Sequence, residues 1–288
     1  MHSPQSMRVL ASGVFMQVDL HTHSTASDGK LTPLELVERA LACGVDLLAI
    51  TDHDTTAGFD SLGDTRFGSL RLVAGIELSA QWRQQTIHVV GLNIGRGRDA
   101  IQEAVSVQQT ARRKRAGIIA ARLAKQGLGD LTDRVEELAS RISVGRPHIA
   151  EMLVESGAVR TIDEAFRKYL GSGRIGDVKD EWASLPQIIA WIRDAGGTAV
   201  IAHPEKYQLT RTRLRELVED FRAAGGEAIE VVSGRQAGSE TRTLAALCEQ
   251  SQLSASTGSD FHQPGQHWAE LGRQPAVPDD CRPVWERW

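Results

Sequence analysis

The chain has 288 residues, of which 41% are apolar and 24% charged, and its formal net charge at pH 7 is −4. This length allows one large domain, or a domain with an insertion. The net charge excludes a basic field over the whole surface, so any binding of nucleic acid would need a local basic patch. Three widely spaced cysteines favour a reducing cytoplasm, and no apolar run reaches the roughly 18 residues that a membrane span needs.

The first part of the chain is expected to alternate strands and helices. Residues 1–16 are expected to be a loose extension, with Met7 or Met16 as alternative starts. The first helix begins after Thr32, which can cap it together with Glu35, and ends at Gly44. Strands are predicted over residues 18–21, 47–51, 70–78 and 86–93.

The pattern changes at residue 99 and changes back near residue 182. Helices are expected over residues 99–126, 146–157 and 161–170, and three glycines between 171 and 176 mark the end of this stretch. Alternation then resumes with segments at 184–195, 198–203, 213–224, 228–232, 239–250 and 253–258.

Alternating strands and helices with short connections predict an α/β fold with a parallel sheet, open or closed into a barrel. Polar residues at the carboxyl ends of successive strands favour the barrel, because active sites lie at that face. We therefore expect a barrel formed by residues 16–98 and 182–275, a helical insertion at 99–181 that overhangs its mouth as a substrate-binding cap, and a tail at 276–288.

Residues able to ligate divalent metals follow most of the predicted strands. His21 and His23 are two apart, which places both on one face of a strand. Glu77 lies in an apolar run, where a buried carboxylate needs a cation. Taken alone, His21 and His23 could be surface histidines on an edge strand, and His88 could be a hydrogen-bonded core histidine. The recurrence of such residues at successive strands favours a metal site. The nine candidate ligands are His21, His23, Asp28, His53, Glu77, His88, His203, Asp260 and His262.

Imidazole and carboxylate ligands without cysteine suit Mn, Fe or Zn better than Ca or Cu(I). Nine ligands are too many for one mononuclear site, so we expect two or three metals per chain, with manganese first and iron or zinc as alternatives. A cluster of this kind suits phosphoester cleavage, because it activates water and stabilises the attacking and leaving oxygens.

These motifs, over residues 18–98 and 182–272, resemble the polymerase and histidinol phosphatase (PHP) family. The residues that carry the resemblance are His21-Thr22-His23, Thr51-Asp52-His53-Asp54, Glu77, His88, His203-Pro204 and Asp260-Phe261-His262. The resemblance implies a distorted (β/α)7 barrel, a trinuclear metal site, and catalytic roles for Glu77, His203 and Asp260. It implies three ligand sets: His21, His23, Glu77 and Asp260; Asp28, His53 and His262; Glu77, His88 and His203.

Within this family, Ser27-Asp28-Gly29 resembles a branch that acts on nucleotides. The resemblance implies release of the 3′-phosphate from nucleoside 3′,5′-bisphosphates, stepwise 5′ to 3′ trimming of short RNA, or both. The expected partner is therefore a small phosphorylated nucleotide or short RNA, with no membrane and no obligate protein partner.

The charge of the predicted insertion is local. Residues 112–125 contain six basic and no acidic residues, whereas 99–181 as a whole contains 14 basic and 13 acidic. Such a cluster suits one or two phosphates, although a solvated helix face is the alternative. Arg146 opens a helix and can bind an anion together with the first amides. The candidate substrate contacts are Arg112, Arg115, Arg146, His148, Lys168 and Tyr169.

Two other functions remain open at this point. Histidinol-phosphate phosphatase would need a carboxylate for the substrate amine, which the basic insertion disfavours. A non-catalytic nucleic-acid-binding domain is disfavoured because all nine ligand positions are filled.

Overall fold

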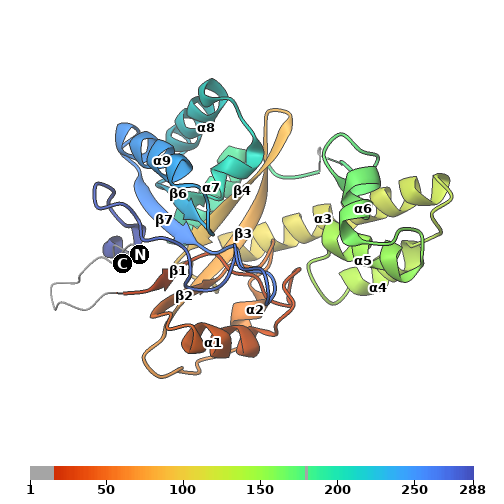
Figure 1. The fold of residues 1–288 in the computed structure, drawn as a ribbon, viewed down its shortest axis with the longest axis horizontal. Helices are drawn as coiled ribbons and strands as arrows, with labels where there is room; N and C mark the ends of the chain where they lie inside the picture. Colours follow the sequence, from red (N-terminus) through yellow and green to blue (C-terminus); the bar gives the residue numbers. More distant parts are fainter. Residues whose placement is uncertain (1–15, 179–180) are drawn as a thin grey trace, which may run out of the picture.

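A nearly closed barrel of seven strands forms the centre of the protein, which the computed structural model describes for residues 16–178 and 181–288 (Figure 1). β4 runs antiparallel to both neighbours, and the other pairs are parallel. The amide N–H of Leu20 donates to the carbonyl of Thr257 at 3.0 Å, which brings β1 beside β7. The predicted barrel is confirmed. In chain and spatial order, its strands are β1 (Val18–Asp19), β2 (Leu47–Ile50), β3 (Arg71–Trp82), β4 (Gln85–Leu92), β5 (Thr198–Ile201), β6 (Ala228–Ser233) and β7 (Ser254–Gly258).

Helices cover the outside of the barrel. α7 (Leu185–Asp194), α8 (Arg211–Ala223) and α9 (Gly238–Gln250) pack on one part of the sheet, and α1 (Pro33–Ala42) packs beside β2 (Figure 1). Smaller side chains from the opposite face of the strands, among them Val18, Val73 and Val200, form a separate apolar cluster. Both faces of the short strands are thus buried, which explains their continuous apolar runs.

The first helix begins as its sequence predicts. The hydroxyl of Thr32 accepts the amide N–H of Glu35 at 3.3 Å, and the Glu35 carboxylate accepts the amide N–H of Thr32 at 2.8 Å. Gly44, with φ of +77°, then reverses the chain towards β2, a conformation that glycine adopts without strain.

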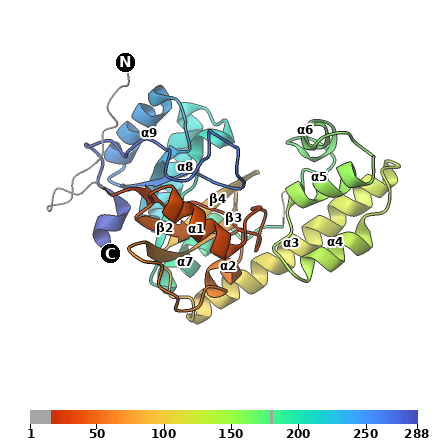
Figure 2. The same cartoon turned by 60° about the horizontal axis from the view of Figure 1, so that its bottom comes forward.

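A helical lobe stands beside the barrel, carried on one long helix (Figures 1 and 2). The first half of that helix packs on the barrel through Ile101 and Ala104, and its second half, with Ile119 and Leu123, enters a core that belongs to the lobe. The lobe contains α3 (Asp99–Lys125), α4 (Thr132–Ala139), α5 (Arg146–Glu155), α6 (Ile162–Ala165) and the π-helical η1 (Phe166–Leu170). α4 was not predicted, and the single helix expected over 161–170 is α6 followed by η1.

The remaining short helices are α2 (Ala57–Asp60), η2 (Pro204–Tyr207) and η3 (Val284–Arg287). Of the expected extension at residues 1–16, residues 1–15 lie outside the described residues, and Met16 packs against the apolar cluster of the barrel. No helix in the described part of the chain is long and apolar enough to cross a membrane.

Candidate metal centre and arginine cavity

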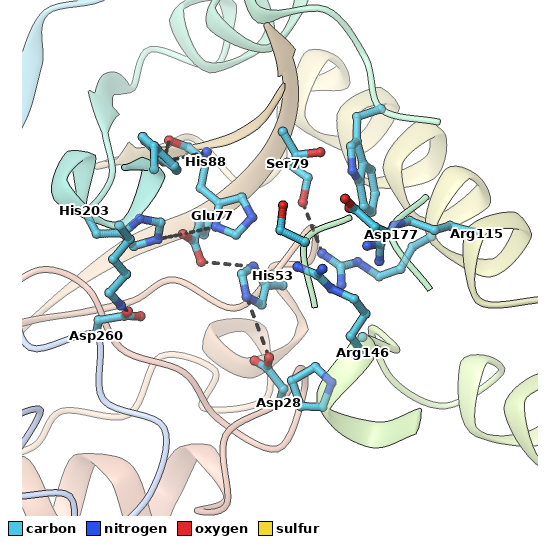
Figure 3. A pocket seen from close by; sticks show the side chains of 18 of the residues that line it. Asp28, His53, Glu77, Ser79, His88, Arg115, Arg146, Asp177, His203 and Asp260 are labelled. Carbon is cyan, nitrogen blue, oxygen red and sulfur yellow. Dashed lines mark hydrogen bonds and ion pairs between the residues drawn. The ribbon is translucent and has the colours of Figure 1, made fainter. Parts of the chain in front are cut away.

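Five imidazoles surround the carboxylate of Glu77, which β3 places at the mouth of the barrel with no exposed surface. Figure 3 shows three of them, His53, His88 and His203. Because this carboxylate is the only group common to all five contacts, it is the centre of the cluster. Its oxygens lie 3.3 Å from His21 Nε2, 3.3 Å from His23 Nε2, 3.0 Å from His53 Nδ1, 2.9 Å from His88 Nδ1 and 3.0 Å from His203 Nε2.

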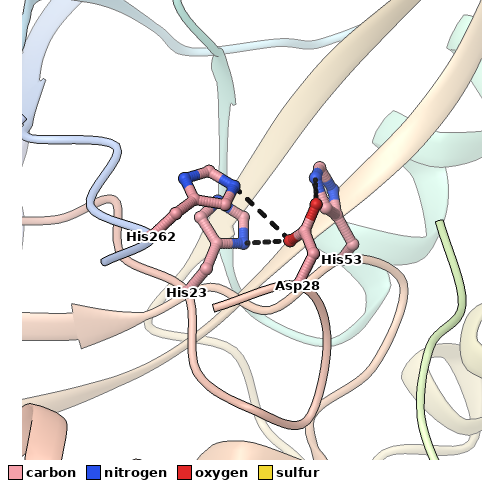
Figure 4. A group of neighbouring side chains, drawn as sticks. All are labelled: His23, Asp28, His53 and His262. Atoms are coloured by element: carbon pink, nitrogen blue, oxygen red, sulfur yellow. Dashed lines mark ion pairs between the residues drawn. The ribbon is translucent and has the colours of Figure 1, made fainter. Parts of the chain in front are cut away.

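Two further carboxylates flank this centre. Oδ1 of Asp260 lies 3.3 Å from His23 Nε2 and 3.5 Å from His21 Nε2. Asp28 lies among three imidazoles, 3.4 Å from His262 Nε2, 3.8 Å from His53 Nε2 and 3.8 Å from His23 Nδ1 (Figure 4). The structure therefore brings all nine predicted ligands into one cluster.

The carboxyl ends of the strands carry most of these groups, and the backbone is strained at three of these ends. Asp54, His203 and Asp260, which follow β2, β5 and β7, have φ of +52°, +27° and +55°. Residues other than glycine adopt such values rarely, and such strain gathers at functional sites.

The cluster has the donor chemistry that divalent cations require. In native proteins nearly all buried polar atoms have a hydrogen-bond partner. Here seven buried nitrogen and oxygen atoms of the candidate ligand residues make no hydrogen bond, although most of them face another candidate ligand at ion-pair distance, as expected where ions complete the site. They are His21 Nε2, His23 Nε2, Asp28 Oδ1, His53 Nδ1, Glu77 Oε2, His88 Nδ1 and His203 Nδ1.

Burial alone would raise the pKa of Glu77, but attraction to His53, His88 and His21 outweighs it and holds that pKa well below the usual value. Glu77 is therefore ionised and available as a ligand.

Four compact groups occur within the cluster, each with candidate ligand atoms within 4.8 Å of one another. Two of them largely reproduce ligand sets implied by the family resemblance. The set of Glu77, His88 and His203 does not appear as one compact group, because each of these histidines joins Glu77 in a different group. The four groups are His23, Asp28, His53 and His262; His21, His23 and Asp260; His21, Glu77 and His203; His53, Glu77 and His88.

Glu230 on β6 is a buried carboxylate that our sequence analysis missed. Both of its oxygens lie 3.3 Å from His21 Nδ1, and one accepts the amide N–H of His203 at 2.5 Å. It orients one imidazole and fixes the backbone of another. Its position within the apolar strand at residues 228–232 is the same signal that identified Glu77.

Asp52 orients an imidazole indirectly. It accepts hydrogen bonds from the hydroxyls of Ser24 at 2.7 Å and Ser27 at 2.6 Å, and the Ser27 hydroxyl lies 3.5 Å from His23 Nδ1. Asp52 thus acts on the imidazole of His23 through the hydroxyl of Ser27.

A cavity of about 430 Å³ opens over the cluster and extends to the helical lobe, with three arginines in its wall (Figure 3). Nε of Arg115 donates to the Val178 carbonyl at 2.7 Å, and Nη1 of Arg146 donates to the Leu170 carbonyl at 3.0 Å. Burial, together with repulsion from Arg146 and Arg112, lowers the pKa of Arg115 to about 9. A bound anion would relieve this repulsion.

Arg112 is held by an ion pair that our sequence analysis also missed. Its Nε donates to Oδ2 of Asp54 at 2.9 Å, and its Nη2 contacts the same oxygen. The Trp182 ring lies beside it, with its centroid 5.2 Å from Cζ of Arg112 and 5.4 Å from Cζ of Arg115. This packing keeps both guanidinium groups at the cavity wall.

The other three predicted substrate contacts lie outside the described lining of this cavity. His148 accepts the amide N–H of Gly145 at 2.9 Å and so caps its own helix. Lys168 pairs with Glu164 at 2.6 Å on the surface, and Tyr169 packs against the core of the helical lobe. Lys206, which was not predicted, lines the cavity and pairs with Asp260.

Known proteins are similar to this chain in sequence and in fold. The PHP domain family matches residues 19–172. The 5′-3′ exoribonuclease Rnm of Escherichia coli is 42% identical over 273 residues, which cover 94% of this chain and 93% of that protein. The 3′,5′-nucleoside bisphosphate phosphatase of Chromobacterium violaceum is 39% identical over 93% of this chain and 95% of that protein.

Solved structures agree. An amidohydrolase from Chromobacterium violaceum, with bound sulfate and no metal, superposes with a TM-score of 0.86 at 39% identity, covering 94% of this chain and 95% of that one. A candidate metal-dependent phosphoesterase from Bifidobacterium adolescentis superposes with a TM-score of 0.76 at 27% identity, and the match covers 93% of both chains.

Proposed function

The chain belongs to the PHP domain family, and from this premise we propose that it releases the 3′-phosphate of nucleoside 3′,5′-bisphosphates and trims short 5′-phosphorylated RNA from the 5′ end. It is a phosphoric ester hydrolase. The bisphosphate is the substrate named for the relative from Chromobacterium violaceum, and the name of the relative from Escherichia coli gives exoribonuclease activity in the 5′ to 3′ direction.

The observation that carries this proposal is one cavity with two kinds of wall. One wall has the carboxylate and imidazole cluster, and the other has Arg112, Arg115 and Arg146. A volume of about 430 Å³ lies within the usual range for small-ligand sites. A substrate with two phosphates can place one over the cluster and the other among the arginines, since guanidinium groups bind phosphate strongly.

We propose that the nine ligands hold two or three divalent ions, manganese first, with Glu77 shared between ions. Ions bound there would activate water and neutralise the charge that develops on the phosphate. The residues of the chain do the rest: Glu230 and Asp52 hold the imidazoles in place, and the arginines bind the 5′-phosphate. The lobe at residues 99–181 would serve as a substrate-binding insertion.

A substrate panel tests the proposal with purified, manganese-loaded protein. It compares adenosine 3′,5′-bisphosphate, adenosine 3′-monophosphate, a short 5′-phosphorylated RNA and histidinol phosphate. A charge-assisted hydrogen bond contributes about 1.5–3 kcal/mol, so the bisphosphate should exceed the 3′-monophosphate in kcat/KM by roughly tenfold or more. Equal turnover of these two, or preference for histidinol phosphate, would contradict the proposal.

Matched variants locate the 5′-phosphate. Arg115→Ala and Arg146→Ala should lower kcat/KM for the bisphosphate by roughly tenfold or more and leave the 3′-monophosphate little changed. Arg113→Ala is the control, because Arg113 lies on the same helix, bonds the Ala139 carbonyl and is not among the described lining residues. Equal losses on both substrates would show that the arginines serve the fold or the chemistry.

A further inference from the structure

A second cavity, of about 460 Å³, also reaches the candidate metal cluster and is lined beyond it by residues that follow β6 and β7. The two cavities share six lining residues, so they form one continuous groove that passes over the cluster. The shared residues are Asp28, Pro147, Phe166, Lys206, Asp260 and His262. His53 lines only the first cavity, whereas His262 lines both, with Asp28 between them (Figure 4). A substrate held over the cluster can therefore extend in two directions.

The charges of the two cavities differ. The first has three guanidinium groups, of which that of Arg112 is paired with Asp54, whereas no arginine is among the described lining residues of the second. Its two ammonium groups already have carboxylate partners, since Lys30 pairs with Glu151 and Lys206 with Asp260. A terminal phosphate carries nearly two negative charges at pH 7, whereas an internal diester carries one. The terminal 5′-phosphate therefore belongs in the first cavity.

The second cavity gathers exposed apolar surface. Five large apolar side chains are exposed among the described residues, and two of them line this cavity. Trp268, after β7, is 63% exposed, and Ile162, at the start of α6, is 37% exposed. The wall also offers polar side chains, including Gln263 and Gln266. Such a surface fits a base and a ribose rather than a phosphate.

Backbone contacts fix the position of Trp268. The amide N–H of Arg235 donates to the Trp268 carbonyl at 2.7 Å, and the amide N–H of Ala269 donates to the Gln266 carbonyl at 2.9 Å. Gly234 has φ of +53°, and a Cβ there would lie 2.5 Å from the Trp268 carbonyl oxygen. The exposed indole therefore stands on a defined turn, as a stacking platform requires.

We propose that the second cavity binds the nucleotide on the 3′ side of the scissile phosphate of 5′-phosphorylated RNA, with its base stacked on Trp268. The inference rests on the proposed function and separates its two substrates, because a nucleoside 3′,5′-bisphosphate leaves this cavity unused.

One bond cleavage then accounts for both activities. The oxygen of water adds to phosphorus, the bond between phosphorus and the 3′-oxygen breaks, and that oxygen takes up a proton. From a bisphosphate, the phosphate leaves as inorganic phosphate. From RNA, it remains on the 5′-oxygen of the next nucleotide, which becomes the new 5′-phosphorylated end.

The test compares Trp268→Ala with wild type on adenosine 3′,5′-bisphosphate and on the 5′-phosphorylated dinucleotide pApA. Stacking on an aromatic side chain is worth about 1–3 kcal/mol per base, so kcat/KM for pApA should fall about 5- to 150-fold. Turnover of the bisphosphate should stay within about twofold. Trp268→Phe should retain most activity on pApA. Leu34→Ala, a similarly exposed apolar truncation on α1 outside both cavities, is the control.

A dinucleotide whose second residue lacks its base isolates the stacking contact. The kcat/KM of wild type should be lower on this substrate than on pApA, by about the factor that Trp268→Ala loses on pApA. Trp268→Ala should have about the same kcat/KM on the two dinucleotides. The inference is overturned if kcat/KM of Trp268→Ala falls equally on the bisphosphate and on pApA, or if it falls on neither substrate. Wild-type turnover of the bisphosphate without turnover of pApA overturns the inference and the RNA-trimming part of the proposed function, but leaves phosphate release from the bisphosphate standing. Failure on both substrates overturns the whole proposed function.

Discussion

Replacing Asp54 by asparagine should destabilise the protein strongly, because every neighbour of this buried carboxylate can donate to it. Oδ1 accepts the amide N–H of Ser79 at 2.8 Å and Nε2 of Gln108 at 3.1 Å, while Oδ2 accepts Nε and Nη2 of Arg112. The side chain of asparagine has one oxygen and one amide nitrogen. In one orientation that nitrogen would face the donors of Ser79 and Gln108, and in the other it would face those of Arg112. Arg112, which is 5% exposed, would also lose its counter-charge beside two other arginines.

Removing one partner of a buried ion pair costs about 3–5 kcal/mol. For a chain of this size, that loss lowers the melting temperature by roughly 6–20 °C. The assay is urea unfolding and thermal melting of chelator-treated protein, so that bound metal does not add to stability. The control is Asp60→Asn, which breaks the exposed Asp60–Arg96 pair and should cost no more than about 1 kcal/mol. A loss in Asp54→Asn as small as in the control would refute the reasoning.

Three further predictions concern the site. The difference in unfolding free energy between wild type and Asp54→Asn should be largest above the ordinary aspartate pKa of 3.8 and should shrink as the pH falls below it. Burial raises the folded-state pKa of Asp54, but attraction to Arg112 outweighs burial and lowers that pKa. A difference in urea unfolding that does not change with pH would exclude the ion pair as the cause. Glu230→Gln should weaken metal binding, measured by titration, roughly 10- to 100-fold, and excess metal should restore its activity. Glu227→Gln, at the surface beside the same strand, should bind metal as wild type does. Glu77→Gln should lose most of its metal and turnover while circular dichroism stays native, and near-normal turnover in the folded variant would count against a central Glu77.

The barrel and the clustering of the candidate ligands could be predicted because both leave local marks in the sequence. Short strands buried on both faces give apolar runs, and the ligands interrupt or follow those runs. The start of α1 was predictable for the same reason, since Thr32 and Glu35 are only three residues apart. Glu230 carried the same mark as Glu77 and could have been found.

The partners of the basic residues could not be predicted, because they depend on long-range contacts. Arg112 and Asp54 are 58 residues apart, and nothing near either residue indicates the pair. Lys168 has a partner four residues away, and His148 bonds the backbone three residues before it, so charge pattern alone overstates their availability for substrate. α4 is short and rich in charge, and its apolar positions become clear only when the lobe is packed.

The central claim is that the cluster around Glu77 binds several divalent ions that phosphoester cleavage requires. The most direct measurement is elemental analysis of the same protein samples in which phosphate release from adenosine 3′,5′-bisphosphate is assayed, during stepwise reloading of chelated protein. We predict at least two Mn, Fe or Zn ions per chain at saturation, with turnover absent from the chelated protein and restored as the ions bind. Saturation at one ion or none, or full turnover without metal, would contradict the claim.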